Sequence, residues 1–221
     1  GTARQYRKDK PLVPIDSKLV VVLTTDAGAD RVLALVLHAS QIQGFCNIPV
    51  EHLFAAPVFV RHLRDLGLED LTIVSPDAGG VERARAYAKR LGATLAIIDK
   101  RRTGANQTEV MNIIGEVEDR NVFVVDDIID TGGTLIHSSD ALLAKGARSI
   151  SASCTHAVLS GPAIQRINNS QLMHVIATNS MPMADKAAEC AKLTTLSIGD
   201  LLAQAIKRIH DEDSVSSLFE M

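Results

Sequence analysis

Two adjacent carboxylates and a turn with two glycines stand close together in this chain, and together they could bind a phosphorylated sugar. The carboxylates belong to Asp126 and Asp127, and the turn consists of Asp130, Thr131, Gly132, Gly133 and Thr134. Ionised carboxylates only accept hydrogen bonds, so this pair can hold the two hydroxyl groups of a ribose ring, directly or through a cation. The backbone N–H groups and hydroxyls of the turn can bind a phosphate group at the start of a helix.

The neighbouring apolar residues place this turn at the end of a strand. Residues 122–125 have the pattern of a strand buried on both faces of a parallel sheet, and helical spacing resumes at Leu135. Open α/β sheets bind ligands at the carboxyl ends of their strands. A simpler alternative is a helix N-cap with solvated acids, since Asp130 and Thr131 are good capping residues. Two glycines between cap and helix cost stability that capping does not require, and this favours the ligand site.

A second turn, residues 75–80, repeats the order of strand, acid, glycine pair and helix. The carboxylate of Asp77 could reach a magnesium ion or its waters, and Gly79 and Gly80 would let a phosphate approach the backbone. Considered alone, this segment is better explained as a type I turn capped by Asp77. The presence of the first loop shifts the interpretation towards ligand binding.

Three consecutive cations, Lys100, Arg101 and Arg102, follow the strand predicted at residues 95–98. They precede Gly104 and are predicted to lie on a mobile loop. The commoner role of such a trio is a solvated cationic turn. Opposite a phosphate-rich pocket, however, fixed cations would stabilise a phosphoryl group during transfer by positioning and electrostatics.

Apolar runs alternate with helical patterns along the whole chain, which predicts an α/β fold with parallel sheets flanked by helices. The predicted strands are residues 32–37, 71–74, 95–98, 122–125, 150–154, 173–177 and 193–198. The predicted helices are residues 59–66, 81–91, 135–145, 162–168 and 200–210. Residues 19–23 are ambiguous, because their β-branched side chains favour a strand.

Composition excludes several other classes of protein. The chain has 221 residues, a net charge of -3, 3% aromatic residues and no tryptophan, so a nucleic-acid partner is not expected. No apolar run approaches the roughly 20 residues that span a bilayer, and no signal peptide is visible, so we expect a cytoplasmic protein without a membrane partner. Three scattered cysteines, Cys46, Cys154 and Cys190, suggest neither a disulfide framework nor a zinc site.

Several stretches together resemble the ribose-phosphate diphosphokinases (PRPP synthetases), which have the type I phosphoribosyltransferase fold. They are residues 3–5, 37–45, 75–81, 98–102, 126–134, 155–156 and 160–162. The resemblance implies two phosphoribosyltransferase-like domains. Residues 1–55 would be the remainder of the N-terminal domain and residues 56–198 the C-terminal domain with the ribose 5-phosphate loop. Residues 199–221 would form a helix and tail packing back on the first domain. It also implies a helix from near Pro14 to near Gly28.

The resemblance implies transfer of the β,γ-diphosphoryl group of MgATP to the C1 hydroxyl of ribose 5-phosphate. Lys100 and Arg102 would stabilise the transferring charge, and Arg4 and Gln5 would contact adenine. Mg2+ would be held by His38 and Asp77, while Asp126, Asp127 and the turn 130–134 would bind ribose 5-phosphate. Family members are usually hexamers, so the resemblance also implies a homo-oligomer.

Some residues depart from the family pattern, which leaves other functions open. Val36 and Asn47 stand where the family has acids, and the chain begins at a point well inside a family member, so an N-terminal part is expected to be missing. One alternative is therefore a non-catalytic, PRPP-synthetase-associated regulatory subunit or an inactive fragment. Another is a salvage phosphoribosyltransferase that attaches a base, although no base-binding hood is recognisable.

Overall fold

The computed structural model describes residues 16–101 and 110–219 of the chain. The chain divides into two compact units, Gly1–Ala55 and Ala56–Met221, which we describe separately. In the described residues, no helix has both the length and the apolar character needed to cross a bilayer.

The first unit contains helix α1 (Asp16–Asp26), strand β1 (Val32–Leu35), the short helix η2 (Ser40–Phe45) and strand β2 (Val50–Leu53). The two strands pair in parallel, with Val32 opposite Val50. Residues 19–23 lie inside α1, so the helix implied by the family resemblance is confirmed. The strand preference of these β-branched residues is a weak local bias that the fold overrides.

Strand β1 ends earlier than the sequence predicts, because Val36 turns the chain. Its φ of 46° lies in the left-handed region, which is unfavourable for a β-branched residue. The Val36 N–H still donates a hydrogen bond of 2.8 Å to the Leu53 carbonyl. The Leu37 N–H then donates to Nε2 of His52 on β2, at 2.9 Å. These bonds fix the start of the segment that leads to His38.

The second unit is built on a seven-stranded sheet with the order β5-β4-β3-β6-β7-β8-β9. All neighbouring strands are parallel except β4 and β5, which are antiparallel. Its strands are β3 (Leu71–Ser75), β4 (Thr94–Arg101), β5 (Val110–Ile114), β6 (Asn121–Ile129), β7 (Ser149–Ala157), β8 (Val175–Thr178) and β9 (Leu193–Leu196). This confirms the predicted fold class, with one antiparallel edge strand added.

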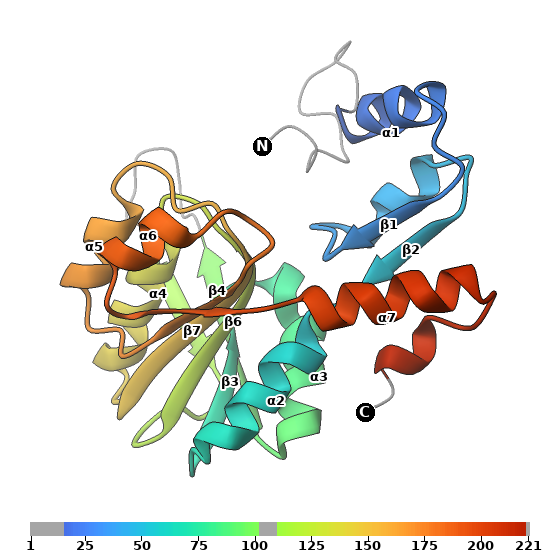
Figure 1. Ribbon diagram of the computed structural model, residues 1–221. Coiled ribbons are helices and arrows are strands. Elements are labelled where there is room, and N and C mark those ends of the chain that lie inside the picture. Colours follow the sequence, from blue (N-terminus) through green and yellow to red (C-terminus); the bar gives the residue numbers. More distant parts are fainter. Residues whose placement is uncertain (1–15, 102–109, 220–221) are drawn as a thin grey trace. The chain divides into compact units, whose positions relative to one another are not determined.

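Helices cover both faces of this sheet. The helices of the second unit are α2 (Ala56–Leu66), α3 (Val81–Leu91), α4 (Gly133–Ala144), α5 (Ala163–Asn169), α6 (Ala184–Glu189) and α7 (Gly199–His210), with short helices η3 (Ala78–Gly80) and η4 (Ser216–Phe219). Helices α2 and α3 lie on one face, and α4 and α5 lie on the other (Figure 1). The core under α4 and α5 is formed by aliphatic side chains such as Val124, Leu142 and Ile167. The sheet is therefore buried on both sides, as the apolar runs predict.

The strand order reverses direction between β3 and β6. From β3 the chain crosses through α3 to β4 on one side, and from β6 it crosses through α4 to β7 on the other. The loops that leave the carboxyl ends of β3 and β6 therefore diverge, and a crevice between such loops is the usual ligand site of an open α/β sheet. Asp77 follows β3, and the turn 130–134 follows β6.

Candidate functional site

Asp126 and Asp127 lie within β6, which continues beyond them to Ile129. The Asp127 side chain is only 5% exposed, whereas that of Asp126 is 27% exposed. The Asp127 N–H donates a hydrogen bond of 2.8 Å to Oδ1 of Asp126. Because a buried carboxylate needs a compensating charge or hydrogen bonds, the surroundings of this pair decide its protonation.

Arg83 on α3 provides that charge. Its Nη1 atom lies 3.4 Å from Oδ1 of Asp126 and 3.4 Å from Oδ1 of Asp127. Sequence reasoning missed this residue. Its only signal is its position in the first turn of the helix that follows the Asp77 turn, which becomes informative once β3 and β6 are known to be neighbours.

Burial, followed by interactions with Asp127, raises the pKa of Asp126 to about 7, and the charge of Arg83 partly opposes this increase. Two nearby groups are kept neutral: burial raises the pKa of Tyr87 and that of the Cys154 thiol, which is opposite Asp126 on β7. The pair can therefore gain or lose a proton near neutral pH, when a ligand or cation arrives.

The turn 130–134 leads directly into α4. Gly132 precedes the helix with a φ of 74°, a conformation that a side chain would strain. The first intrahelical bond runs from the Ile136 N–H to the Gly132 carbonyl, at 3.0 Å. The N–H groups of the first helical turn therefore have no partner within the helix and face the strand end, as anion binding requires.

Residues of α5 and of the connection between β7 and α5 form hydrogen bonds to this turn. The Ser160 hydroxyl donates a hydrogen bond to the Asp130 carboxylate. The Ser160 N–H donates to the Asp130 carbonyl at 3.0 Å. The Arg166 guanidinium donates to the Thr131 carbonyl at 2.9 Å. Residues 160–162, which are part of the family resemblance, thus begin the segment that holds the turn in place.

Asp77 caps the short helix that follows β3. Its Oδ1 accepts a hydrogen bond of 2.9 Å from the Gly80 N–H, as the simpler interpretation of this turn predicts. Gly80 is required by space, because a Cβ there would lie 2.8 Å from the Ser75 hydroxyl oxygen. The side chain of Asp77 is exposed. Capping uses one of its carboxylate oxygens, so a metal role is compatible with this turn.

The predicted loop position of the basic trio is wrong for its first two members. Lys100 and Arg101 lie in strand β4, where they pair with Met111 and Val110 of β5. The edge strand β5, which the sequence did not predict, extends β4 by antiparallel pairing. The third member, Arg102, lies outside the described residues, as do Arg4 and Gln5.

His38 belongs to the first unit and has an exposed side chain. Its predicted metal partner, Asp77, belongs to the second unit. Within residues 16–101 and 110–219, no group of three or more His, Cys, Asp or Glu side chains could hold a metal ion. The described part of the chain therefore offers isolated metal donors rather than a protein-built cage.

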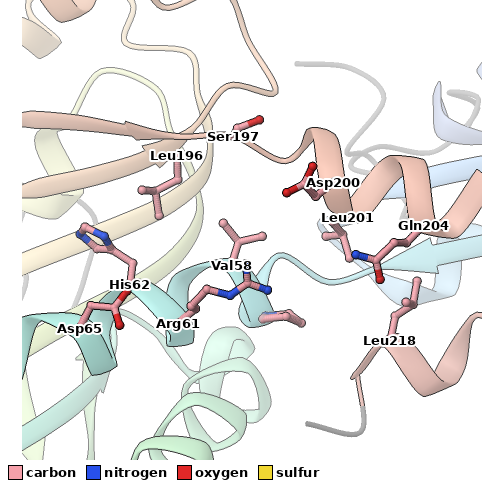
Figure 2. Close-up of a pocket in the computed structure, with 11 residues that line it drawn as sticks. Val58, Arg61, His62, Asp65, Leu196, Ser197, Asp200, Leu201, Gln204 and Leu218 are labelled. Carbon is pink, nitrogen blue, oxygen red and sulfur yellow. The ribbon is translucent and has the colours of Figure 1, made fainter.

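A cavity of about 240 Å3 lies elsewhere in the second unit, between α2 and the start of α7. Figure 2 shows Arg61 extending from α2 towards α7, which contributes Asp200 and Gln204. None of the predicted site residues lines this cavity. The candidate site is instead formed by the loops that leave the carboxyl ends of β3 and β6.

Comparison with known proteins identifies the family. Residues 102–220 match the family model "Phosphoribosyl synthetase-associated domain". A ribose-phosphate pyrophosphokinase of Chlorobaculum tepidum is 50% identical over 221 residues, which are 100% of this chain and 68% of the relative. The chain belongs to the ribose-phosphate pyrophosphokinases. This family of enzymes is the one that the sequence motifs indicate.

Further comparisons agree with this assignment. The ribose-phosphate pyrophosphokinase of Bacillus subtilis is 50% identical over 219 residues, which are 99% of this chain and 69% of the relative. The crystal structure of phosphoribosylpyrophosphate synthetase from Mycobacterium smegmatis matches with a TM-score of 0.87 and 36% identity. That match covers 96% of this chain and 69% of the other. The non-catalytic subunit and the salvage transferase are therefore not favoured.

Proposed function

We propose that this ribose-phosphate pyrophosphokinase transfers the β,γ-diphosphoryl group of ATP to the C1 hydroxyl of ribose 5-phosphate. The hydroxyl oxygen forms a bond to the β-phosphorus, the bond from that phosphorus to the oxygen of the α-phosphate breaks, and the hydroxyl proton is released. The products are phosphoribosyl diphosphate and AMP. The observation that carries the proposal is the acidic pair beside a glycine-rich turn that opens a helix at the reversal of strand order.

In this proposal the carboxylates of β6 hold the ribose ring. Asp126 and Asp127 accept hydrogen bonds from two ring hydroxyls, and Arg83 keeps negative charge on the pair. The turn 130–134 binds the 5-phosphate through the N–H groups at the start of α4. Because both ends of the sugar are held, its C1 hydroxyl has a fixed position relative to ATP.

Lys100 and Arg102 are proposed to neutralise the charge that develops on the transferred group. Lys100 lies at the carboxyl end of β4, which neighbours β3, so it is anchored by strand pairing rather than by a loop. Phosphoryl transfer requires little covalent chemistry from the protein, and fixed cations contribute by positioning and electrostatics. Arg4 and Gln5 are proposed to contact adenine.

His38 and Asp77 are the proposed protein ligands of Mg2+. The donor chemistry fits, because Mg2+ in nucleotide enzymes is commonly bound by one or two carboxylates together with water and substrate phosphates. When bound, the ion would neutralise phosphate charge. Asp77 contributes an exposed carboxylate beside Gly79 and Gly80, where a phosphate can approach the backbone.

The remaining inferences come from the family resemblance and the composition. We propose a homo-oligomer, a hexamer by resemblance, located in the cytoplasm and acting without nucleic acid or membrane. Size-exclusion chromatography with light scattering measures the oligomeric state directly.

The proposed function is tested by AMP formation in the presence of Mg2+, ATP and ribose 5-phosphate. Formation of AMP should require both substrates and should be lost in Lys100→Ala and Asp127→Asn. A matched control is Lys145→Ala, a change of an exposed lysine at the end of α4. AMP formed equally without ribose 5-phosphate, or equally by Asp127→Asn, would contradict the proposal.

A further inference from the structure

The turn 130–134 contains an acid and no basic residue, although its proposed ligand is a dianionic phosphate group. Its donors are backbone N–H groups and the hydroxyls of Thr131 and Thr134. These groups supply partial charges only. A cation beside the turn would therefore contribute strongly to the binding of a phosphate monoester.

Arg166 on α5 lies against this turn. Its Nη1 donates a hydrogen bond of 2.9 Å to the Thr131 carbonyl. The same atom lies 3.4 Å from the place that a Cβ on Gly133 would occupy. The guanidinium therefore bonds to the turn at Thr131 and lies close to Gly133, and it extends from a helix whose first residue, Ala163, is fully buried.

The described part of the chain places no carboxylate in an ion pair with this guanidinium. Asp130, the acidic residue of the turn, accepts a hydrogen bond from the Ser160 hydroxyl instead of one from Arg166. One N–H group of Arg166 bonds to the Thr131 carbonyl, and a guanidinium has four more donors.

We propose that Arg166 is a binding and specificity-determining residue for the phosphate end of the sugar substrate. The bond to the Thr131 carbonyl fixes the guanidinium beside the turn, and its positive charge then favours a sugar that carries a 5-phosphate over the free sugar. This inference rests on the proposed function, since it names a further contact for the same substrate. It assigns a role to a residue outside the glycine-rich turn.

The test compares Arg166→Lys, which keeps the charge, with Arg166→Gln, which keeps a hydrogen-bond donor but removes the charge. Calorimetry measures the binding of ribose 5-phosphate to the full chain, and kinetics give KM for ribose 5-phosphate and for ATP. Arg166→Gln should weaken ribose 5-phosphate binding about tenfold, whereas Arg166→Lys should recover much of the affinity. KM for ATP should stay unchanged. Arg148→Gln is the matched control, because Arg148 pairs with Asp119 and Asp70 on the surface.

Each outcome decides between the two proposals. If the wild-type chain binds ribose 5-phosphate and Arg166→Gln binds it equally well, the role of Arg166 is contradicted while the proposed function stands. If Arg166→Gln and Arg166→Lys lost the same affinity for ribose 5-phosphate, with unchanged melting temperatures, a role based on charge would also be contradicted. If the wild-type chain does not bind ribose 5-phosphate, the proposed function fails and the role of Arg166 fails with it.

Discussion

The guanidinium of Arg83 lies 3.4 Å from a carboxylate oxygen of Asp127, and this ion pair connects α3 to the central strand β6. The same guanidinium nitrogen also reaches Asp126. Helix α3 starts directly after the turn of Asp77, so the arginine links the helix that follows one of the two diverging loops to the strand that precedes the other. The negative charge of the proposed ribose site is therefore partly balanced by a residue from the neighbouring crossover.

Replacing Arg83 by Ala should destabilise the second unit, because the buried Asp127 carboxylate would lose its counter-ion. The expected loss in the free energy of unfolding is about 2 kcal/mol, less than for a fully buried pair because Arg83 and Asp126 are partly exposed. Urea unfolding followed by circular dichroism measures it. The double variant Arg83→Ala with Asp127→Asn should recover part of the loss. Equal stabilities of the single variant and the wild type would show that the ion pair does not stabilise the fold.

Stability should depend on pH through Asp126. Burial and the neighbouring Asp127 raise the pKa of Asp126 from its ordinary value of 3.8 to about 7, so the folded state binds the proton more tightly than the unfolded state. The stability that this tighter proton binding contributes is fully present below the pKa of Asp126 in the unfolded state. It is lost as pH rises through the pKa of Asp126 in the folded state. Asp126→Asn should therefore gain stability relative to the wild type between about pH 4 and pH 7. Urea titrations across this range would contradict the assignment if the difference between the two proteins stayed constant.

Gly80→Ala should disturb the Asp77 turn. Its Cβ would meet the Ser75 hydroxyl oxygen at 2.8 Å, and that hydroxyl donates a 2.7 Å hydrogen bond to the Asp77 carbonyl. We expect a loss of about 1–3 kcal/mol in the free energy of unfolding, together with weaker ATP binding. Gly44→Ala is the matched control, because no atom lies within 4 Å of a Cβ there. Adding Ser75→Ala to Gly80→Ala should reduce the loss; an unchanged loss would mean that this clash is not its cause.

Val36→Asp should relieve backbone strain and introduce the acid that the family resemblance implies at this position. A β-branched residue is unfavourable at the φ of 46° that Val36 adopts, whereas Asp tolerates the left-handed region better. The melting temperature of the chain should not fall, although an apolar residue is lost. If His38 binds Mg2+, the Mg2+ concentration for half-maximal activity should fall as well. A lower melting temperature would show that packing of Val36 outweighs its strain.

Much of the fold could be predicted because its central strands are continuous apolar runs and helices such as α2, α3 and α7 are amphipathic. The runs before Asp126 and Asp77 locate β6 and β3, and the glycines beyond them locate the turns. Strand β5 was missed, and the position of Lys100 was therefore wrong, because residues 110–114 become a strand only by pairing with the extended β4.

The candidate site could be predicted only in part, for a similar reason. Asp126, Asp127 and the turn 130–134 are adjacent in sequence, so their common site is visible without a structure. Arg83 and Arg166 reach the site from separate helices, and their contacts depend on how α3 and α5 pack on the sheet. Short-range patterns carry no information about such long-range contacts.

The most direct test of the account is phosphorus NMR of a reaction that contains the wild-type chain, Mg2+, ATP and ribose 5-phosphate. The two outer phosphorus atoms of ATP should move together to a diphosphate on C1 of the sugar, with AMP as the other product and no ADP. Transfer of both phosphorus atoms by the wild type, and its loss in Asp127→Asn, would confirm that the acidic pair on β6 serves diphosphoryl transfer. Formation of ADP and of a sugar that carries a single phosphate on C1 would contradict it. No reaction by a folded chain that binds both substrates would also contradict it.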